Sequence, residues 1–231
     1  MSHIHLIGGE KGGVGKSLVS RLLAQYFIDR QIPFSAFDTD RSHGALLRFN
    51  AGYAVPVSLD KHDGLDVIVE AAALDPNRRV LVDLAAQTQA TLAHWIEDAG
   101  VFDVAREIGT SLRYWHVMDA SRDSVDLLAW LLNGFGSQMS LVLVLNEVRG
   151  DRFDLLQGSG LLDRARSHNA EVVSLRKLPD ATMQKLDGQS TSFWAAVHAP
   201  DRAATGLGLL ERQRVKVWLQ RTYAEFDRIG A

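Results

Sequence analysis

The sequence contains no cysteine and no strong excess of either charge. Across its 231 residues the cysteine count is zero, so disulfides, thiolate zinc sites and cysteine-held iron–sulfur clusters are excluded. The formal net charge is −3, which gives no overall basic field for binding nucleic acid. Any contact with DNA would therefore have to be local.

Long apolar runs and a secretory leader are also missing. No apolar run approaches the roughly 20 residues that span a bilayer. Residues 1–6 lack the basic region and apolar core of a secretory signal, so we expect a cytoplasmic protein. The hydrophobic share of 46% is that of an ordinary globular protein, and the length suits one α/β domain over residues 1–231.

Short apolar runs alternate with helical patterns along the whole chain. The expected strands are residues 4–7, 34–37, 80–84, 114–118, 141–145 and 172–175. The expected helices are residues 16–30, 64–74, 88–99, 121–135, 160–168 and 202–229, and residues 41–59 and 179–200 are expected to be irregular. This alternation predicts an α/β fold, a doubly wound and mostly parallel sheet with helices on both faces.

The first expected strand leads into the glycine-rich loop GGEKGGVGKS and then a helix. Backbone N–H groups and a helix N-terminus meet at such a loop, which suits a triphosphate. Lys16 supplies a charge for the β and γ phosphates, and the Ser17 hydroxyl can ligate Mg²⁺. The expected nucleotide-binding residues here are Gly12, Gly13, Val14, Gly15, Lys16, Ser17 and Leu18.

A strict phosphate-loop pattern fails at Glu10, but a second lysine follows it. With both Lys11 and Lys16, KGGVGKS resembles the deviant Walker A motif of the ParA/MinD family of P-loop ATPases. In that family the first position need not be glycine, and the early lysine reaches nucleotide phosphates in a partner subunit. The resemblance implies that Lys11 acts in trans within a sandwich dimer that closes on two ATP molecules. We expect the Glu10 side chain to point away from the phosphates.

Three acids follow the second and third expected strands. The FDTD segment carries Asp38 and Asp40, and VLVDLAAQT carries Asp83. Carboxylates at this edge of an open α/β sheet can meet a magnesium shell or an attacking water. The family resemblance implies Mg²⁺ contacts for Asp38 and Asp83, beside Ser17, and a water-positioning role for Asp40. The alternative for Asp38 and Asp40 is a pair of solvated turn acids.

The base-recognition segment lacks the residues that read guanine. The fifth expected strand ends in Asn146 within N-E-V-R, where GTPases carry N-K-x-D, so ATP is favoured. Asn146 is a candidate adenine contact, with a turn-forming asparagine as the alternative. Pro179 lies where family members cover the base with backbone.

The leading function is an ATPase switch: ATP closes a homodimer, the dimer binds a partner, and slow hydrolysis releases it. Lys11, Lys16 and Asp40 would be the catalytic residues, with ATP and Mg²⁺ as cofactors. We expect an unidentified protein partner that stimulates hydrolysis. Contact with non-specific DNA is left open. Peripheral membrane contact is disfavoured, because the basic C-terminal helix is best interpreted as a capping helix that buries its apolar face on the sheet.

The cellular role is less sharply indicated than the ATPase. VLVDLAAQT, LVLVLNEVRGD and SFWAAV look somewhat like the TraL and StbB type proteins of conjugative and mobile plasmids. That resemblance favours plasmid partition, stability or conjugative transfer as the process served. The alternative is a small-molecule ATP-dependent ligase of the dethiobiotin synthetase or cobyric acid type.

Overall fold

The structure is a computed structural model that describes residues 3–9, 11–40, 44–59, 62–136, 138–199 and 205–231, with residues 62 and 63 described by their backbone alone. Glu10, for which the sequence predicts an outward side chain, lies outside the described residues. Within the described part of the chain, the structure has no helix that is both long enough and apolar enough to cross a membrane.

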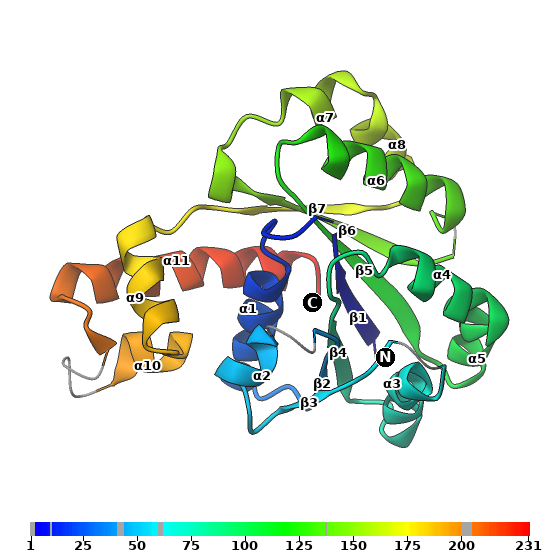
Figure 1. Ribbon diagram of the computed structural model, residues 1–231, viewed down its shortest axis with the longest axis horizontal. Coiled ribbons are helices and arrows are strands. Elements are labelled where there is room, and N and C mark those ends of the chain that lie inside the picture. Colours follow the sequence, from blue (N-terminus) through cyan, green and yellow to red (C-terminus); the bar gives the residue numbers. More distant parts are fainter. Residues whose placement is uncertain (1–2, 10, 41–43, 60–61, 137, 200–204) are drawn as a thin grey trace.

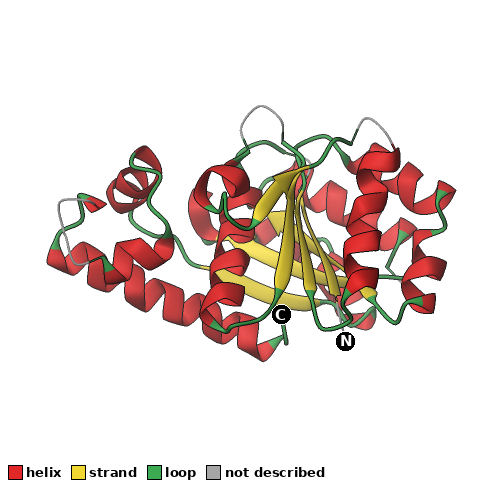
Figure 2. Cartoon of the chain, turned by 90° about the horizontal axis from the view of Figure 1, so that it is seen from below, coloured by secondary structure: helices red, strands yellow, loops and turns green. Residues whose placement is uncertain are grey.

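Seven strands form one parallel sheet, in the order β3-β2-β4-β1-β5-β6-β7. The strands are β1 (His3–Gly8), β2 (Phe34–Asp38), β3 (Ala54–Pro56), β4 (Arg79–Asp83), β5 (Ser111–Met118), β6 (Ser140–Asn146) and β7 (Glu171–Leu175). Figure 2 shows the sheet between helices on both sides. The predicted doubly wound α/β fold is confirmed.

Helices cover both faces of the sheet because the central strands are apolar on both sides. One face carries α1 (Lys16–Asp29), α2 (Ala45–Phe49), α9 (Asp180–Gly188), α10 (Phe193–His198) and α11 (Leu209–Arg228). The other carries α3 (His62–Leu74), α4 (Gln89–Asp98), α5 (Val101–Glu107), α6 (Arg122–Gly134), α7 (Asp154–Gly158) and α8 (Leu161–Ser167). A short 3₁₀ helix, η1 (Glu147–Arg149), follows β6.

Two segments that the sequence predicts to be irregular are partly regular. Residues 41–59 include α2 and β3, and residues 179–200 include α9 and α10. These elements are too short for periodicity to reveal them, and they form because side chains such as Leu186 and Phe193 pack into the core. The short helices α5 and α7 were not predicted either.

The last helix begins later than the sequence predicts. It starts at Leu209 rather than at residue 202, since Gly208 is its N-cap and the Glu211 carboxylate accepts a hydrogen bond from the Gly208 N–H at 2.8 Å. Its apolar residues Val215, Trp218 and Phe226 are buried against the sheet. This packing agrees with the interpretation of the helix as a capping helix.

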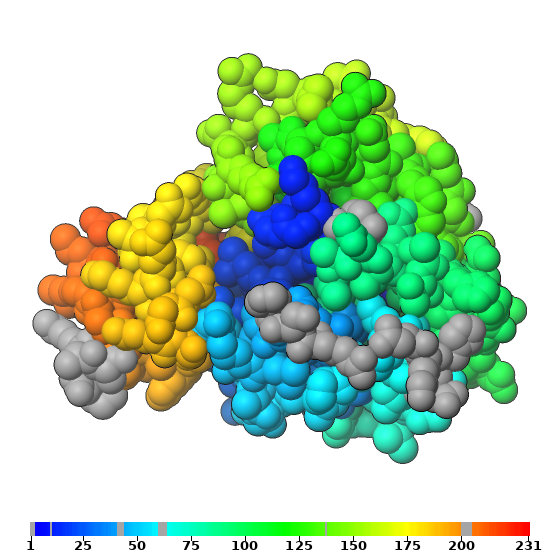
Figure 3. All heavy atoms as spheres, viewed as in Figure 1, coloured from blue at the N-terminus to red at the C-terminus, as the bar shows by residue number. Residues whose placement is uncertain are grey.

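The strand order places β1 at the centre, with β4 on one side and β5 on the other. After β1, the next three strands along the chain all lie on the β4 side, and β5, β6 and β7 lie on the other side. The direction in which strands are added to the sheet therefore reverses beside β1. Ligands of open parallel sheets bind at the carboxyl ends of strands near such a reversal. Figures 1 and 3 show the segment that follows β1, in dark blue, at the molecular surface near the middle of the view.

A buried histidine on β5 gives the fold a dependence on pH. The His116 side chain is fully buried, with Nε2 2.9 Å from the Ser124 carbonyl oxygen, and Nδ1 has no hydrogen-bond partner among the described residues. Burial lowers the pKa of His116 from 6.5 to about 4, although the Ser124 carbonyl raises it in part. Folding therefore favours the neutral imidazole.

We predict that His116 makes the protein less stable as the pH falls below 6.5. Between pH 6.5 and about 4 the unfolded chain binds a proton that the folded chain does not, so stability is lost. At pH 5.0 this cost is about 2 kcal/mol. Urea denaturation at pH 7.5 and 5.0 should show wild type losing about 2 kcal/mol more than His116→Gln, while the exposed-site control His94→Gln follows wild type. Equal losses for wild type and His116→Gln would contradict the prediction.

Candidate nucleotide-binding site

The glycine loop between β1 and α1 leaves a helix N-terminus open. Helix α1 begins at Lys16, and its N-cap, Gly15, has no side chain that could cap the first turn. The N-cap, Gly15, has φ +102°, and a Cβ there would lie 2.2 Å from Asn146 Nδ2. Only glycine combines that backbone conformation with that close approach. The first N–H groups of α1 are thus available to an anion.

Lys16 and the residues that follow it form the first turn of α1, at the end of this loop. The Lys16 side chain is almost buried, and its Nζ donates to the Lys11 carbonyl oxygen at 3.1 Å. The Lys16 side chain therefore reaches from the end of the loop, at the start of α1, back to Lys11 near its beginning. Ser17 and Leu18, in the first turn of α1, are partly exposed. The predicted loop residues therefore lie together at the N-terminus of α1, where Lys16 supplies a positive charge.

Asp38 and Asp83 lie side by side at the ends of β2 and β4, where their Cα atoms are register partners. Asp38 is 1% exposed, and its two oxygens accept N–H groups from Asp40 at 3.0 Å and Leu47 at 3.1 Å. Burial raises the pKa of Asp38, while these backbone donors lower it in part. Asp38 is thus a fixed, buried acid and not a solvated turn residue.

Asp83 is the less satisfied of the two acids. It is 2% exposed, and neither carboxylate oxygen has a hydrogen-bond partner among the described residues. Burial, and then the negative charge of Asp38, raise the pKa of Asp83 to about 7. The nearby hydroxyls of Ser17 and Ser20 and the Lys16 ammonium lower it in part. Among the described residues, none within ion-pairing distance supplies a positive charge to this carboxylate.

Thr39 joins the two acid-bearing strands, a role that the sequence did not reveal. Its backbone N–H and its hydroxyl each donate to the Asp83 carbonyl oxygen at 3.0 Å, and the hydroxyl accepts the Ala85 N–H at 2.8 Å. Asp40 follows directly and is partly exposed. The segment after Asp83 is therefore tied to the segment that carries Asp40.

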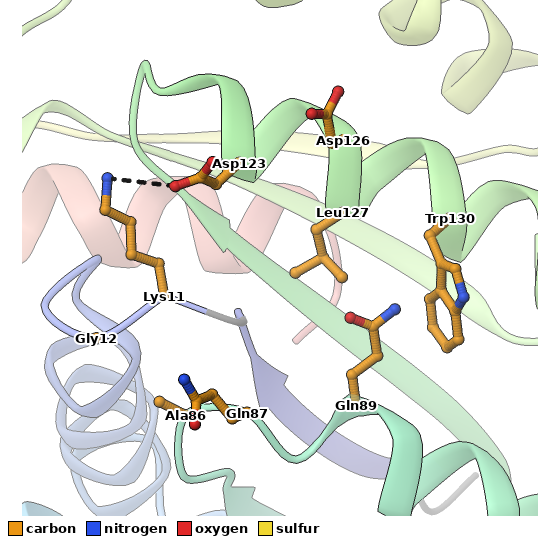
Figure 4. A pocket seen from close by; sticks show the side chains of 9 residues that line it. All are labelled: Lys11, Gly12, Ala86, Gln87, Gln89, Asp123, Asp126, Leu127 and Trp130. Carbon is orange, nitrogen blue, oxygen red and sulfur yellow. Dashed lines mark ion pairs between the residues drawn. The ribbon is translucent and has the colours of Figure 1, made fainter.

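Lys11 points away from the loop on which it lies. Its Nζ is 3.7 Å from Asp119 Oδ2 and 3.9 Å from Asp123 Oδ2, and a third of its side chain is exposed. Figure 4 shows the chain extended from the loop towards Asp123 on α6. Lys11 lines a cavity of about 670 Å³ between the phosphate loop, the segment after Asp83 and α6. The two lysines of the motif thus occupy different environments.

Asn146 braces the phosphate loop. Its side chain is 1% exposed, Nδ2 donates to the Val14 carbonyl oxygen at 2.7 Å, and Oδ1 accepts the Val148 N–H at 3.3 Å. The turn-forming alternative is thus realised, and adenine contact stays a prediction. Pro179 is exposed, and it lines a cavity of about 470 Å³ together with Glu147, the residue after Asn146.

Asp119 and Arg149 are further site residues that the sequence prediction missed. Asp119 directly follows β5, and its side chain is 3% exposed. Burial raises its pKa, but hydrogen bonds from Ser121 and Ser124 and the charge of Lys11 outweigh that effect, so the pKa is lowered. An acid directly after an apolar strand was a visible signal, the same one that marked Asp38 and Asp83.

Two curated proteins are similar to this chain in sequence at low identity. It is 24% identical to Protein TraL of Escherichia coli over 244 residues, covering 98% of each chain. It is 24% identical to Protein MobD of Acidithiobacillus ferrooxidans over 200 residues, covering 84% of this chain and 86% of MobD. No family model matches the sequence.

Among solved structures, the MinD cell division protein of Aquifex aeolicus has the same fold. It aligns with a TM-score of 0.52 at 13% sequence identity, over 96% of each chain. The resemblance to the ParA/MinD family, first indicated by the loop, is thus confirmed for the fold. The predicted likeness to TraL is confirmed as sequence similarity.

We predict that Asp83→Asn stabilises the protein at alkaline pH in the absence of nucleotide and metal. Since the folded pKa is about 7 and the ordinary value is 3.8, the charged form costs up to about 4 kcal/mol above pH 7. This cost shrinks below pH 7 and disappears as the pH falls towards 4, because the unfolded chain then also binds the proton that the folded protein holds. Urea denaturation at pH 8.0 and 5.5 should show an advantage for Asp83→Asn that shrinks at pH 5.5.

The matched control is Asp126→Asn, because Asp126 is an exposed acid on α6. Its stability should follow that of wild type at both pH values. A wild-type protein as stable as Asp83→Asn at pH 8.0 would show that the buried carboxylate carries no such cost.

Proposed function

We propose that this chain is a Mg²⁺-dependent ATPase that acts as a molecular switch in the cytoplasm, with residues 1–231 working as one ATPase domain. The observation that carries the proposal is the buried Asp83 carboxylate, without a hydrogen-bond partner among the described residues, beside the open N-terminus of α1. The phosphates would bind at the loop and Lys16, through backbone N–H groups and the ammonium.

The residues at the loop fit a magnesium ion. Mg²⁺ takes oxygen ligands, commonly one or two carboxylates together with phosphates and water. Ser17 and Asp83 would offer oxygen atoms to the ion, and Asp38 would contact it through a water molecule. A divalent cation there would supply the positive charge that Asp83 lacks and would neutralise charge on the phosphates. Asp40 would position the attacking water.

The environment of Lys11 supports a role in a partner subunit. Its ammonium lies near Asp119, which follows β5, and Asp123 on α6, and its chain is directed away from the phosphate loop of its own subunit. Lys16 already spans that loop. We therefore propose that ATP binding closes a homodimer in which Lys11 contacts nucleotide bound by the other copy, and that slow hydrolysis opens it.

The proposed cargo is macromolecular, and a further protein partner would stimulate hydrolysis. Similarity to TraL and MobD favours plasmid partition, stability or conjugative transfer over a metabolic ligase. ATP is favoured over GTP because Arg149 stands where GTPases carry the guanine-reading acid, and a guanidinium cannot accept hydrogen bonds.

We predict that Lys16→Ala and Lys11→Ala have different effects. Lys16→Ala should abolish ATP binding measured by calorimetry, because it removes the charge at the phosphates. Lys11→Ala should keep most of the monomer's ATP affinity and lose ATP-induced dimerisation measured by light scattering. The control is Lys185→Ala, because Lys185 on α9 pairs with Glu211 at 2.8 Å outside the site. A Lys11→Ala protein that dimerises like wild type would refute the role in trans.

We predict that Asp40→Ala binds ATP but hydrolyses it at least about tenfold more slowly, because the attacking water loses its positioning group. The ATP-bound dimer should therefore persist for longer in light scattering, and phosphate release should slow by a similar factor. Asp154→Ala, which removes an exposed acid paired with Arg152, is the control. Wild-type turnover by Asp40→Ala would remove Asp40 from catalysis.

A further inference from the structure

Arg149 lies at the rim of the phosphate loop although it is far from the loop in sequence. It ends η1, after β6, and about half of its side chain is exposed. Its guanidinium extends back to the loop, where a Cβ added to Gly13 would lie 3.2 Å from Arg149 Nη2. Gly13 has φ +78°, so glycine suits this position both for its conformation and for the space that the guanidinium occupies.

The Asp119 carboxylate holds Arg149 in this position. Oδ1 of Asp119 accepts the Ser121 N–H at 3.1 Å and the hydroxyls of Ser121 and Ser124 at 2.5 and 2.9 Å. Its Oδ2 is left to the cations: Arg149 Nη1 donates to it at 3.2 Å, and Lys11 Nζ lies 3.7 Å away. Because the first oxygen is fixed to the start of α6, the second is fixed as well.

The charges around Arg149 leave it only partly neutralised. Asp119 is the one carboxylate among the described residues within ion-pairing distance of it, and that carboxylate is shared with Lys11. One Nη1 hydrogen bond uses one of five guanidinium donors. The remaining donors include those of Nη2, on the side towards Gly13. A cation with unused donors therefore stands beside the backbone that would hold the phosphates.

We propose that Arg149 contacts the phosphate chain of the nucleotide bound in its own subunit, from the rim at Gly13. The guanidinium fork matches phosphate oxygens better than a point charge does, and charge-assisted hydrogen bonds are among the strong ones. Asp119 is the positioning residue that keeps the fork at the loop. This inference rests on the proposed function, because it requires a nucleotide at the loop.

The test compares Arg149→Ala with Arg152→Ala by calorimetric titration with ATP and ADP. Arg152 is three residues further along the chain, is 83% exposed, and pairs with Asp154 at 2.7 Å, so it matches Arg149 in charge but not in place. Loss of a charge-assisted contact should weaken the binding of ATP by about tenfold or more. The affinity should also become less sensitive to KCl, whereas Arg152→Ala should match wild type in both respects.

A second variant separates the phosphate contact from the support of the fold. Arg149→Gln keeps a donor for Asp119 and removes the charge and the fork, so its thermal unfolding without nucleotide should match wild type. It should lose a similar share of ATP affinity and of the ATP-induced rise in unfolding temperature. If Arg149→Ala fails to fold, Arg149→Gln alone decides the matter.

Failure of this inference differs from failure of the proposed function. If wild type and Lys16→Ala both fail to bind ATP, the proposed function is wrong. If wild type binds ATP and Lys16→Ala does not, while Arg149→Gln keeps wild-type affinity, the role of Arg149 alone is overturned. Equal weakening by the Arg149 and Arg152 variants would reduce the effect to general surface charge and would also overturn it.

Discussion

The burial of an unpaired carboxylate at the end of β4 is the constraint around which the site is organised. Asp83 is 2% exposed, stands beside Asp38 in register, and has no hydrogen-bond partner among the described residues. Two buried acids in contact with apolar strands disfavour their own charged forms, which raises the pKa of both. The free-energy cost of charging these acids falls where the strand ends, the N-terminus of α1 and Lys16 meet. A bound cation and its phosphates would repay it.

The acids on the two sides of β1 are used in opposite ways. On the β4 side, Asp83 lacks a partner, so this side is suited to a ligand that brings positive charge. On the β5 side, Asp119 is saturated by hydroxyl and backbone donors and by two cations, so its pKa is lowered. One carboxylate is thus left without a hydrogen-bond partner among the described residues, and the other holds Lys11 and Arg149 at the rim of the loop.

The fold and the cellular role rest on different kinds of likeness. MinD, at 13% identity, shares the architecture over nearly the whole chain, and architecture alone does not fix a partner. TraL and MobD are nearer in sequence, at 24% identity, and the proposed cellular role rests on that similarity. Within this chain, the surface beside Lys11 carries exposed Trp130 and acidic side chains of α6. Partner choice would depend on surfaces of this kind.

The sequence by itself determined the features that depend on neighbouring residues. The loop from Gly12 to Ser17 was readable because adjacent glycines, a lysine and a serine set the backbone and the charge locally. The alternation of apolar runs with helical patterns predicted the parallel sheet, and acids at the ends of two of those runs marked Asp38 and Asp83 as candidate site residues. The short elements α2, β3, α9 and α10 escaped prediction because packing, and not periodicity, forms them.

Tertiary structure alone decided which distant residues meet. Asn146 binds the Val14 carbonyl across 132 positions, Thr39 bridges to Ala85 across 46, and Arg149 meets Asp119 across 30. Strand order sets these meetings, because it places the ends of β2 and β4, and those of β5 and β6, side by side. The state of each acid was likewise decided in three dimensions. Asp83 ends one apolar strand, Asp119 directly follows another, and both are buried, so the donors around each carboxylate separate the unpaired one from the saturated one.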